Sequence, residues 1–381
     1  MSEWKKVKLD DCLELITYGF TNPMPDSKSG PWKVTAKDIV NGKINYSSAR
    51  HTSKEAFENE LTDKSRPIKN DLLLTKDGTL GRLAIVGDEV ICINQSVALL
   101  RVRKNLIYVP YLYYLLSTPL FQGKMLADAG GSTIKHIYIT RVNQLVIPCP
   151  SFDEQICLAT TLSRYDSLIE NYQKQIKLLE EAAQRLYKEW FVDLHFPGHE
   201  NTNIIDGVPE GWEKKKVGEI TPIKTGKKDA NYGTEDGAYP FFTCAQEPIK
   251  APSYSFDTSA VILAGNGDFN VKLYRGRFEA YQRTYVLEPT NEKMLYLLYF
   301  CISENMNRLA TGASGSTIKF LTKGMIESLV INEPSINVLN FFNHIIEPIR
   351  TQKENFQSQI RLLTEARDRL LPKLMSGDIE I

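Results

Sequence analysis

The sequence predicts an α+β protein in which two mixed α/β domains are separated by a long antiparallel two-helix coiled coil, as a pseudo-two-fold tandem repeat. First, the pentapeptide GSTIK occurs at positions 131–135 and again at 315–319, and 315 − 131 gives an offset of 184. Second, the same offset aligns LVI at 145–147 with LVI at 329–331. Third, each copy ends in hydrophobic residues at alternating steps of three and four. A large unit repeated at one offset indicates a tandem array.

Composition is that of a globular protein with more than one domain. The chain has 381 residues, 42% of them hydrophobic and 24% charged, which is too long for one ordinary core. The first residues, MSEWKKVKLDD, hold no apolar segment, and we expect neither a signal peptide nor a membrane span. Six scattered cysteines without CxxC pairs indicate reduced thiols. We therefore expect a cytoplasmic protein.

The net charge is zero overall but uneven along the chain. Residues 1–150 carry 20 Lys and Arg against 15 Asp and Glu, a net charge of +5, whereas 151–199 carry −3 and 200–333 carry −2. A nucleic-acid binder usually shows a basic excess, and only the first unit does. This balance argues against tight DNA binding by the chain on its own.

The first globular segment is expected to place strands before helices. Apolar runs indicate strands at residues 71–75, 83–86 and 97–102. The turn at 76–81 separates the first two runs, and Asn94-Gln95-Ser96 leads into the third. Pro110 and Pro119 are each expected to begin a helix, because proline is favoured at the first helical position.

The second globular segment repeats this order with different residues. Strands are expected at 261–263 and 284–287, a turn at 265–268 and a helix at 295–302. The segment opens at Trp212, the counterpart of Trp4 at an offset of 212 − 4 = 208. Because this offset exceeds that of the GSTIK repeats, the first segment is longer than the second by 208 − 184 = 24 positions. The two globular segments differ in length and sequence, whereas the segments that follow them match. This contrast indicates that the variable and the matching segments have different tasks.

Each repeat is predicted to end in a long helix. Ser151 with Glu154 three residues later fits a capping box at the start of the first helix. Unbroken steps of three and four, the coiled-coil period, define the seams: Leu162, Tyr165, Ile169, Tyr172, Ile176, Leu179, Ala183, Leu186 and Trp190, then Ile346, Ile349, Lys353, Phe356, Ile360, Leu363, Arg367, Leu370 and Leu374. The two basic seam residues can cover apolar surface while their charged heads reach water or a partner acid.

The two helices are expected to pair with each other. A strict seam is narrower than the stripe of a helix that packs against its own domain, which is the alternative. The first helix leads into the second globular segment and the second helix leaves it, so pairing requires an antiparallel arrangement. The predicted organisation is a first domain at 1–150, a helix at 151–191, a Pro/Gly-rich linker at 192–211, a second domain at 212–334 and a second helix with a C-terminal tail at 335–381.

No catalytic motif is visible. The P-loop pattern GxxxxGK[ST] does not occur, and no methyl-donor-binding glycine motif follows a strand. His195 and His199 lie four residues apart in the linker, where a metal would lack a fixed backbone and further ligands. We expect no enzyme activity from this chain alone, no metal site and no cofactor.

Polar turns beside basic residues remain, and their chemistry suits DNA. Arg and Lys can pair with guanine, Asn and Gln with adenine, and all of them can hold phosphate. For any one of them a solvated turn is the alternative. The recurrence of Thr133 and Lys135 as Thr317 and Lys319 favours a framework or phosphate role. The DNA-binding candidates are Lys76, Thr79, Arg82, Asn94, Gln95, Arg101, Arg103, Thr133, Lys135, Lys227, Lys228, Asn231, Asn266, Lys272, Arg275, Arg277, Arg283, Thr317 and Lys319.

Several motifs together resemble the specificity subunit of type I restriction-modification systems over almost the whole chain. They are the openings at Trp4 and PEGW (209–212), DGTLG (77–81), NQSV (94–97), both GSTIK repeats, LVIPCP ending at Pro150 and WFVD (190–193). Each is weak alone, but their order on this repeat is specific. In the second copy Asn266-Gly267-Asp268 replaces the DGTLG turn, and Val338 stands where the capping glutamate would be.

The resemblance implies two target recognition domains that read the halves of a split, asymmetric site in double-stranded DNA. It implies that the paired helices set the spacing and dock two adenine methyltransferase (modification) subunits, with restriction and translocase subunits added. S-adenosylmethionine, ATP and magnesium would be bound by those partners. One alternative is the DNA-reading subunit of a bifunctional type II restriction-methylation enzyme. Another is a two-headed coiled-coil scaffold that binds proteins and no DNA.

Overall fold

The computed structural model describes residues 4–127, 135–313 and 319–379, and it divides into two compact units. Unit 1 comprises Met1–Gln173 together with Ser358–Ile381, and unit 2 comprises Lys174–Gln357. This division cuts both long helices, whereas the boundaries predicted from the repeat follow the ends of the helices, and those boundaries stay a prediction. None of the described helices is long and apolar enough to cross a membrane.

Unit 1 is built around a four-stranded antiparallel sheet that is buried on both faces. The strand order is β2–β10–β7–β8. Leu72 and Leu74 of β7 pack into one buried cluster and Leu73 packs into another, because successive side chains of a strand point to opposite faces. The strands are β2 (Leu13–Tyr18), β7 (Leu72–Thr75), β8 (Leu83–Ile85) and β10 (Val97–Val102). The strands expected before and after the 76–81 turn and after Asn94-Gln95-Ser96 are confirmed.

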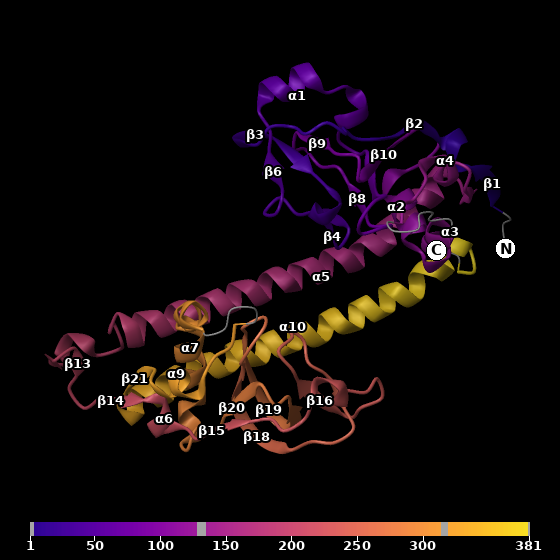
Figure 1. Cartoon of the computed structure of the whole chain (residues 1–381). Coiled ribbons are helices and arrows are strands. Elements are labelled where there is room, and N and C mark those ends of the chain that lie inside the picture. The colour runs from indigo at the N-terminus through magenta and orange to yellow at the C-terminus, as the bar shows by residue number, and fades with distance from the viewer. Residues whose placement is uncertain (1–3, 128–134, 314–318, 380–381) are drawn as a thin grey trace. The chain divides into compact units, whose positions relative to one another are not determined.

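Helices cover one face of this sheet and a second layer of strands covers the other (Figure 1). Tyr111, Leu115 and Phe121 bring the helices against β7 and β10. On the other face, β3 pairs in parallel with β9 and antiparallel with β6. The elements are β3 (Ser27–Val34), β4 (Ile39–Val40), β5 (Lys43–Ile44), β6 (Arg50–His51), β9 (Ile91–Ile93), α1 (Lys54–Glu60), α2 (Val109–Ser117), α3 (Pro119–Ala127) and α4 (Ile139–Val142).

Unit 2 contains a six-stranded sheet with the order β15–β20–β18–β19–β16–β17. All neighbours are antiparallel except β19 and β16. The strands are β15 (Ile223–Thr225), β16 (Tyr239–Phe242), β17 (Ile249–Ala251), β18 (Phe256–Ala264), β19 (Val271–Ala280) and β20 (Thr284–Leu287), and the helices are α6 (Val217–Ile220), α7 (Leu295–Glu304), α8 (Met306–Gly312) and α9 (Lys323–Glu327). The long strand β19 has no counterpart among the sequence predictions.

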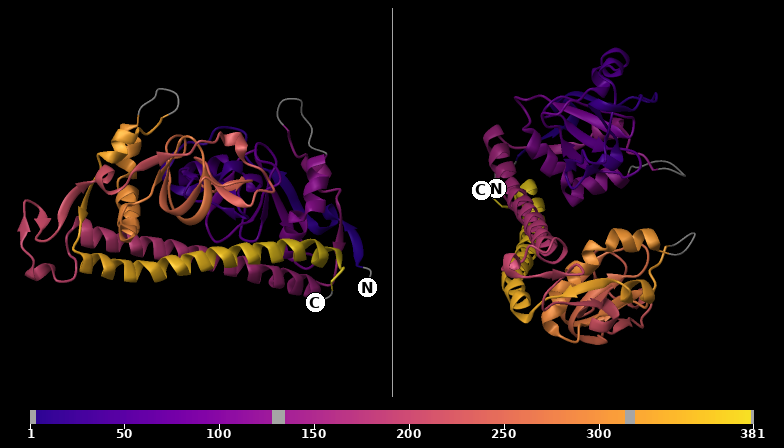
Figure 2. Two further views of the ribbon diagram at one scale, coloured as in Figure 1. Left: turned by 90° about the horizontal axis from the view of Figure 1, so that it is seen from below. Right: turned by 90° about the vertical axis from the view of Figure 1, so that its left-hand side faces the viewer.

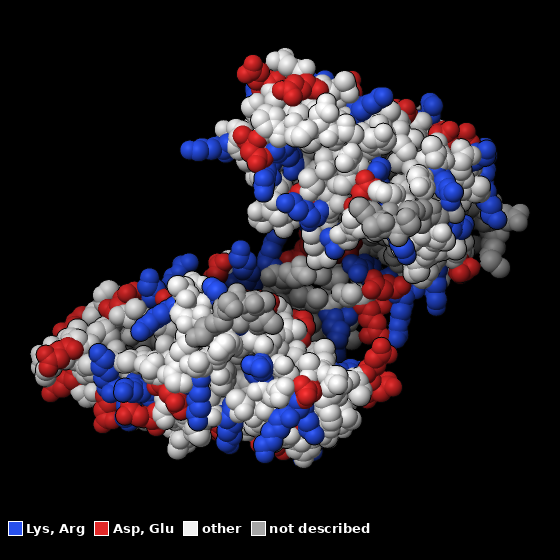
Figure 3. All heavy atoms as spheres, viewed as in Figure 1, with Lys and Arg blue, Asp and Glu red and all other residues white. Residues whose placement is uncertain are grey.

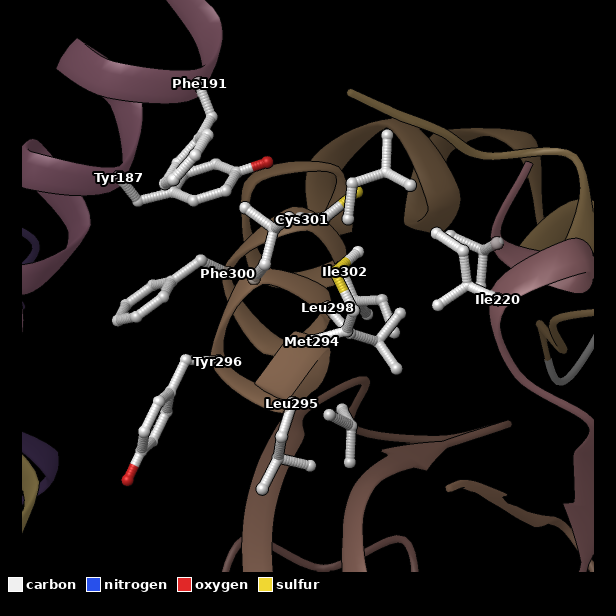
Figure 4. Close-up of a cluster of buried hydrophobic side chains, with 14 of the residues drawn as sticks. Tyr187, Phe191, Ile220, Met294, Leu295, Tyr296, Leu298, Phe300, Cys301 and Ile302 are labelled. Atoms are coloured by element: carbon white, nitrogen blue, oxygen red, sulfur yellow. The ribbon is translucent and has the colours of Figure 1, made fainter. Parts of the chain in front are cut away.

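The core of unit 2 forms where α7 meets the end of the first long helix. Figure 4 shows Tyr187 and Phe191 projecting toward the side chains of α7, among them Phe300 and Cys301. The rings of Tyr187 and Phe300 stack with centroids 5.7 Å apart. Burial of the Tyr187 ring raises the pKa of its hydroxyl far above the usual range. The aromatic end of the first long helix is therefore part of the second domain's core.

A small two-stranded sheet is built in each unit from the chain before and after the variable segment. In unit 1, β1 (Lys5–Lys8) pairs with β11 (Val146–Cys149), and Lys8 faces Val146. In unit 2, β14 (Glu213–Lys216) pairs with β21 (Val330–Glu333), and Lys216 faces Val330. The position numbers differ by 216 − 8 = 208 and by 330 − 146 = 184, the two offsets found in the sequence. The tandem repeat is therefore confirmed in the backbone pairing.

The first long helix, α5 (Phe152–Tyr187), begins at the predicted capping box and ends in a π-helical turn, Lys188–Val192. The Ser151 N–H donates to Glu154 Oε2 at 2.8 Å, and the Glu154 N–H donates to Ser151 Oγ at 3.3 Å. The hydrogen bonds from Ser151 hold the pKa of Glu154 below its usual range. The capping box is therefore confirmed.

In unit 1 the start of α5 lies beside the end of the second long helix, α10 (Ile336–Ser376). Leu162 of α5 and Leu374 of α10 share one core, and Arg367 Nη1 lies 2.6 Å from Asp166 Oδ1. The same core contains α2, so packing of α5 against its own domain occurs together with the helix pairing.

In unit 2 the end of α5 lies beside the start of α10, and the two helices again run antiparallel (Figure 2). Ala183 and Ile346 share the core of this unit, and Lys353 Nζ lies 2.5 Å from Glu180 Oε1. Both basic seam residues of α10 therefore reach an acid of α5, as the sequence predicts.

The predicted linker is ordered and packed in the structure. Phe196 is buried against Trp212, with ring centroids 4.6 Å apart. A short hairpin follows, formed by β12 (Ile204–Ile205) and β13 (Val208–Pro209). In unit 1 the equivalent tryptophan, Trp4, packs near the end of α10, 3.5 Å from the place that a Cβ on Gly377 would take. Each repeat thus closes with a tryptophan beside a long-helix end.

Candidate nucleic-acid interface

Four segments of unit 1 meet at one edge of its sheet, and we call them the first turn cluster: residues 18–20, 76–81, 94–96 and 135–137. Backbone hydrogen bonds tie them together. The Lys76 N–H donates to Ser96 O at 2.9 Å, the Ile137 N–H donates to Lys76 O at 2.9 Å, and the Gln95 N–H donates to Phe20 O at 2.9 Å. The residue that follows the first GSTIK repeat is therefore fixed beside the glycine turn.

Unit 2 contains an equivalent set, the second turn cluster: residues 226–228, 265–268, 281–283 and 319–321. The Gly265 N–H donates to Arg283 O at 2.9 Å, the Leu321 N–H donates to Gly265 O at 2.8 Å, and the Gln282 N–H donates to Lys228 O at 2.9 Å. The backbone frame around the two turns is thus the same although their sequences differ.

One glycine in each cluster is required by a close backbone approach. A Cβ on Gly19 would lie 1.8 Å from Ile93 O, and a Cβ on Gly226 would lie 1.9 Å from Ala280 O. A residue with a side chain cannot be placed there without moving backbone. Both clusters therefore have a glycine at this point because a neighbouring carbonyl oxygen occupies the place of a Cβ.

Polar side chains in the first turn cluster are linked through Asp77. Lys76 Nζ lies 2.7 Å from Asp77 Oδ2, and His136 Nδ1 lies 2.5 Å from Asp77 Oδ1. Lys76 Nζ also lies 5.2 Å from the centroid of the Tyr18 ring, and its side chain is only 15% exposed. Thr79 and Gln95 are exposed beside this group.

The second turn cluster uses different side-chain contacts at the same place. Cys244 Sγ donates to Asn266 Oδ1 at 2.7 Å, and Gln246 Nε2 donates to Asp268 Oδ2 at 2.6 Å. Lys228 Nζ lies 4.3 Å from the centroid of the Tyr232 ring. The two clusters therefore present different groups on a common backbone.

The structure brings about half of the predicted DNA-binding residues into these clusters. In the first they are Lys76, Thr79, Asn94, Gln95 and Lys135, and in the second they are Lys227, Lys228, Asn266, Arg283 and Lys319. Two further candidates lie near the clusters: Arg82, whose guanidinium donates to Ile39 O at 3.0 Å, and Asn231. Thr133 and Thr317 lie outside the described residues. Contact of any of these residues with DNA stays a prediction.

Other predicted residues lie away from the clusters. Arg101 makes two hydrogen bonds to Asp71, of 3.0 and 2.7 Å, which raise the pKa of Arg101, and Asp71 is 3% exposed. Arg103 is exposed just beyond the end of β10. Arg101 and Asp71 form a structural ion pair. The sequence near Arg101 does not predict this pair, because Asp71 lies 30 residues away.

Three basic residues of β19 also have partners in unit 2. Arg275 Nη1 lies 2.9 Å from Glu347 Oε1 on α10, and Arg277 Nε lies 3.0 Å from Asp257 Oδ2. Lys272 Nζ donates to Ala245 O at 2.8 Å, and burial lowers the pKa of Lys272. The sequence predicts these three only as basic residues beside a polar turn, and the structure places them on the strand β19. Their contact with DNA stays untested.

Sequence reasoning did not name several cluster residues as binding candidates, namely Asp77, His136, Asp268, Gln282 and Phe320, and it did not name Gln246, which contacts the second turn cluster. Two of them had a signal, because His136 and Phe320 directly follow the lysine of the two GSTIK repeats. The contacts of Gln246 had none, since its partner Asp268 lies 22 residues away.

The described surface carries charged residues of both signs. On the face shown in Figure 3, Lys and Arg are interspersed with Asp and Glu over both units. Within residues 4–127, 135–313 and 319–379, no group of three or more His, Cys, Asp and Glu could hold a metal ion. His195 and His199 of the linker lie with their ring centroids 5.3 Å apart.

Unit 2 also contains a cavity of about 700 Å³ between α5, α7, α10 and β19. The cavity is lined by both polar and apolar residues.

Comparison with known proteins finds relatives that are similar to this chain in sequence. The family described as type I restriction modification DNA specificity domain matches residues 1–181 and 209–357. The specificity subunit of the type I restriction enzyme MjaIX from Methanocaldococcus jannaschii is 28% identical, and the match covers 100% of this chain and 94% of that protein. The specificity subunit of the type I restriction enzyme EcoDI from Escherichia coli is 37% identical over 45% of this chain and 39% of that protein.

A solved structure shares the fold. The crystal structure of the S subunit of a type I restriction-modification system from M. genitalium has a TM-score of 0.63 and 20% sequence identity, with 98% of this chain and 96% of that chain covered. The family match spans most of the chain and includes both turn clusters. The chain therefore belongs to the family of type I restriction modification DNA specificity domains.

Proposed function

We propose that this chain is the non-catalytic recognition subunit of a type I restriction-modification complex, in which each unit reads one half of a bipartite, asymmetric DNA site. The observation that carries this proposal is the pair of turn clusters, which share a backbone frame and differ in their side chains. Two copies of one frame with different surface chemistry suit two different half-sites.

The side chains of the clusters suit the two kinds of contact that DNA binding requires, contacts to phosphates and contacts to bases. Exposed Lys135 and Lys319 can pair with phosphates, which fix position without reading sequence. The side-chain amide of Asn266 and the imidazole of His136 can pair with base edges. With a net charge of zero over the whole chain, tight binding requires basic surface from a partner.

The names of the relatives support the choice of partners. The relatives are named as specificity subunits of type I restriction enzymes. We propose that α5 and α10 set the spacing between the half-sites and dock two adenine methyltransferase (modification) subunits, with restriction and translocase subunits added in the full complex. S-adenosylmethionine, ATP and magnesium would be bound by those partners, and the complex would act in the cytoplasm. Neither the type II alternative nor a DNA-free scaffold is favoured by the family match.

The test is a map of methylated adenines by single-molecule sequencing of genomic DNA. Cells carrying this chain with its neighbouring methyltransferase gene are compared with cells in which only this chain is deleted. We expect one bipartite motif, methylated on both strands, to disappear on deletion. A methylation pattern that is the same in both strains would contradict the proposal.

A second measurement tests the absence of catalysis in the chain itself. The purified chain is incubated with plasmid DNA and S-adenosylmethionine, alone and with the methyltransferase subunit. Methyl transfer is expected only in the mixture. Turnover by the chain alone would contradict a purely recognitional role.

A further inference from the structure

One position in each turn cluster has an equivalent backbone location in the two units but a chemically different side chain. His136 and Phe320 each follow the lysine of a GSTIK repeat, so they are related by the repeat offset, 320 − 136 = 184. Each forms a single antiparallel bridge with the glycine turn, His136 with Asp77 and Phe320 with Asn266. A comparison of the two clusters therefore places these two side chains at the same point of the two units.

Two other pairs of residues at equivalent points are identical in the two units. Lys135 and Lys319 precede the two bridge residues, and both are exposed. Gln95 and Gln282 occupy the same place, since the N–H of each donates 2.9 Å to the segment after Gly19 or Gly226. DNA offers the same phosphates and sugars to both units but different bases. Identical residues therefore suit the backbone of DNA, and residues that differ suit the bases.

Among the described residues, the contact of His136 with Asp77 engages Nδ1 of its ring and leaves Nε2 available to bind a base. The Asp77 carboxylate can only accept hydrogen bonds, so the 2.5 Å contact assigns the proton on His136 to Nδ1. Asp77 is itself held through its other oxygen by Lys76 at 2.7 Å. The ring is thus oriented by a fixed carboxylate, and its side chain is 40% exposed. In the neutral ring Nε2 is then an acceptor.

Phe320 presents an apolar ring at the equivalent point and is 38% exposed. Its bridge partner, Asn266, has its side-chain oxygen occupied by Cys244. An exposed aromatic ring beside a lysine offers no hydrogen bond, but it offers a surface that excludes water. In the major groove the matching apolar group is the C5-methyl of thymine.

We propose that position 136 in unit 1, and the equivalent position 320 in unit 2, determine one base pair of each half-site. His136 Nε2 accepts a hydrogen bond from an exocyclic amino group, that of cytosine N4 or adenine N6, and Phe320 packs on a thymine methyl. Lys135 and Lys319 hold the adjacent phosphate in both units. The inference rests on the proposed function and assigns residues within it.

The first test separates base reading from a structural role of His136. In His136→Asn, the side-chain amide takes the place of Nδ1 and can still donate to Asp77, but nothing stands at the place of Nε2. Single-molecule sequencing of methylated adenines in cells with the assembled complex is the measurement. We expect the first half-site to become degenerate at one base pair, with a loss of discrimination of roughly ten-fold, and the second half-site to be unchanged.

The matched change in unit 2 is Phe320→Ala. The residue is exposed, so the truncation leaves the core intact, and one position of the second half-site is expected to lose its preference for an A·T pair. Lys135→Ala is the control, and it is expected to weaken binding of the purified complex to all duplexes alike and to reduce the salt slope by about one.

The outcomes are distinct. Full methylation of an unchanged motif in His136→Asn and in Phe320→Ala would overturn the proposal while leaving the proposed function intact. Absence of any methylated motif in cells with the unaltered chain would overturn the proposed function itself. If His136→Asn abolishes methylation, binding of the complex to duplexes varied at each base pair decides: a uniform loss contradicts the assignment, and a loss confined to one pair supports it.

Discussion

Arg367 and Asp166 lie 201 residues apart in the sequence, yet Nη1 of the arginine is 2.6 Å from Oδ1 of the aspartate. Asp166 also accepts a hydrogen bond from the Tyr114 hydroxyl at 2.5 Å. One carboxylate thus ties α5 to both α10 and α2. In unit 2 Lys353 of α10 pairs with Glu180 of α5. Glu180 comes 180 − 166 = 14 residues after Asp166 on α5, and Lys353 comes 367 − 353 = 14 residues before Arg367 on α10. The helix register is therefore the same in both units.

The Asp166 carboxylate is predicted to stabilise unit 1. Replacement by alanine leaves Nη1 of Arg367 and the Tyr114 hydroxyl without their acceptor in a partly buried site, although Nε and Nη2 of Arg367 keep their hydrogen bonds to Asp368. We expect the free energy of unfolding to fall by about 1–3 kcal/mol. The matched control is Glu181→Ala, which breaks an exposed i,i+4 pair with Lys177 and is expected to cost less than about 0.5 kcal/mol. Equal losses in chemical denaturation of the two variants would contradict the assignment.

Arg101 is predicted to act on folding more than on DNA. Arg101→Ala leaves the buried Asp71 carboxylate unpaired, which is expected to cost about 3–5 kcal/mol. Arg103→Ala, at an exposed position two residues on, is expected to change stability by less than about 0.5 kcal/mol. Thermal unfolding and the salt dependence of DNA binding are measured together. A stable Arg101→Ala protein with a reduced salt slope would restore its role as a DNA contact.

The capping box predicts an acid-dependent loss of stability. Because the folded-state pKa of Glu154 lies below the ordinary value of 4.5, its contribution is present above that value and is lost as the pH falls through the folded pKa. Unfolding of the protein and of Glu154→Gln is compared between neutral and acidic pH. The difference between them should shrink below about pH 4.5. A constant difference would show that Glu154 does not cap the helix in solution.

The shared register allows both helices to be lengthened without breaking their pairing. Seven residues inserted after Lys174 of α5 and seven after Ser358 of α10 add one heptad to each helix near the boundary between the two units. Each helix grows by about 10 Å at about 1.5 Å per residue, close to three base pairs at about 3.4 Å each. We expect the same half-sites with a gap longer by about three base pairs in methylation maps. The insertion in α5 alone is the control, and it should disrupt the complex.

The packing of Trp4 beside Gly377 predicts that the chain tolerates circular permutation. New ends are opened between Asp206 and Gly207, which lie at the exposed turn of the β12–β13 hairpin, and the old ends are joined by a short flexible bridge. Exposed turns are the favoured sites for such changes. The permuted chain should fold and support methylation of the same motif. A cut beside the buried Phe196 is the control and should impair unit 2.

The sequence allowed the frame to be predicted better than the variable segments. β10 spans Val97–Val102 and β20 spans Thr284–Leu287, both as expected, because a strand buried on both faces is a plain apolar run. β3 and β19 were missed, since Ser27–Val34 and Val271–Ala280 each contain several polar residues and a glycine and are not continuous apolar runs. The same holds at the site. The glycine turns were visible, whereas the contact between His136 and Asp77 joins residues 59 apart and depends on the tertiary fold.

The makeup of unit 1 has a consequence for synthesis on the ribosome. Leu374 and Met375 fill the core that also holds the early strands β7 and β10, and they are translated only after the whole of unit 2. Unit 2, in contrast, is one continuous stretch, Lys174–Gln357. The order of folding should therefore run against the order of translation: the second unit can complete its core on the emerging chain, while the first must wait with part of its apolar surface uncovered. That interval is when unit 1 is most exposed to chaperones and proteases.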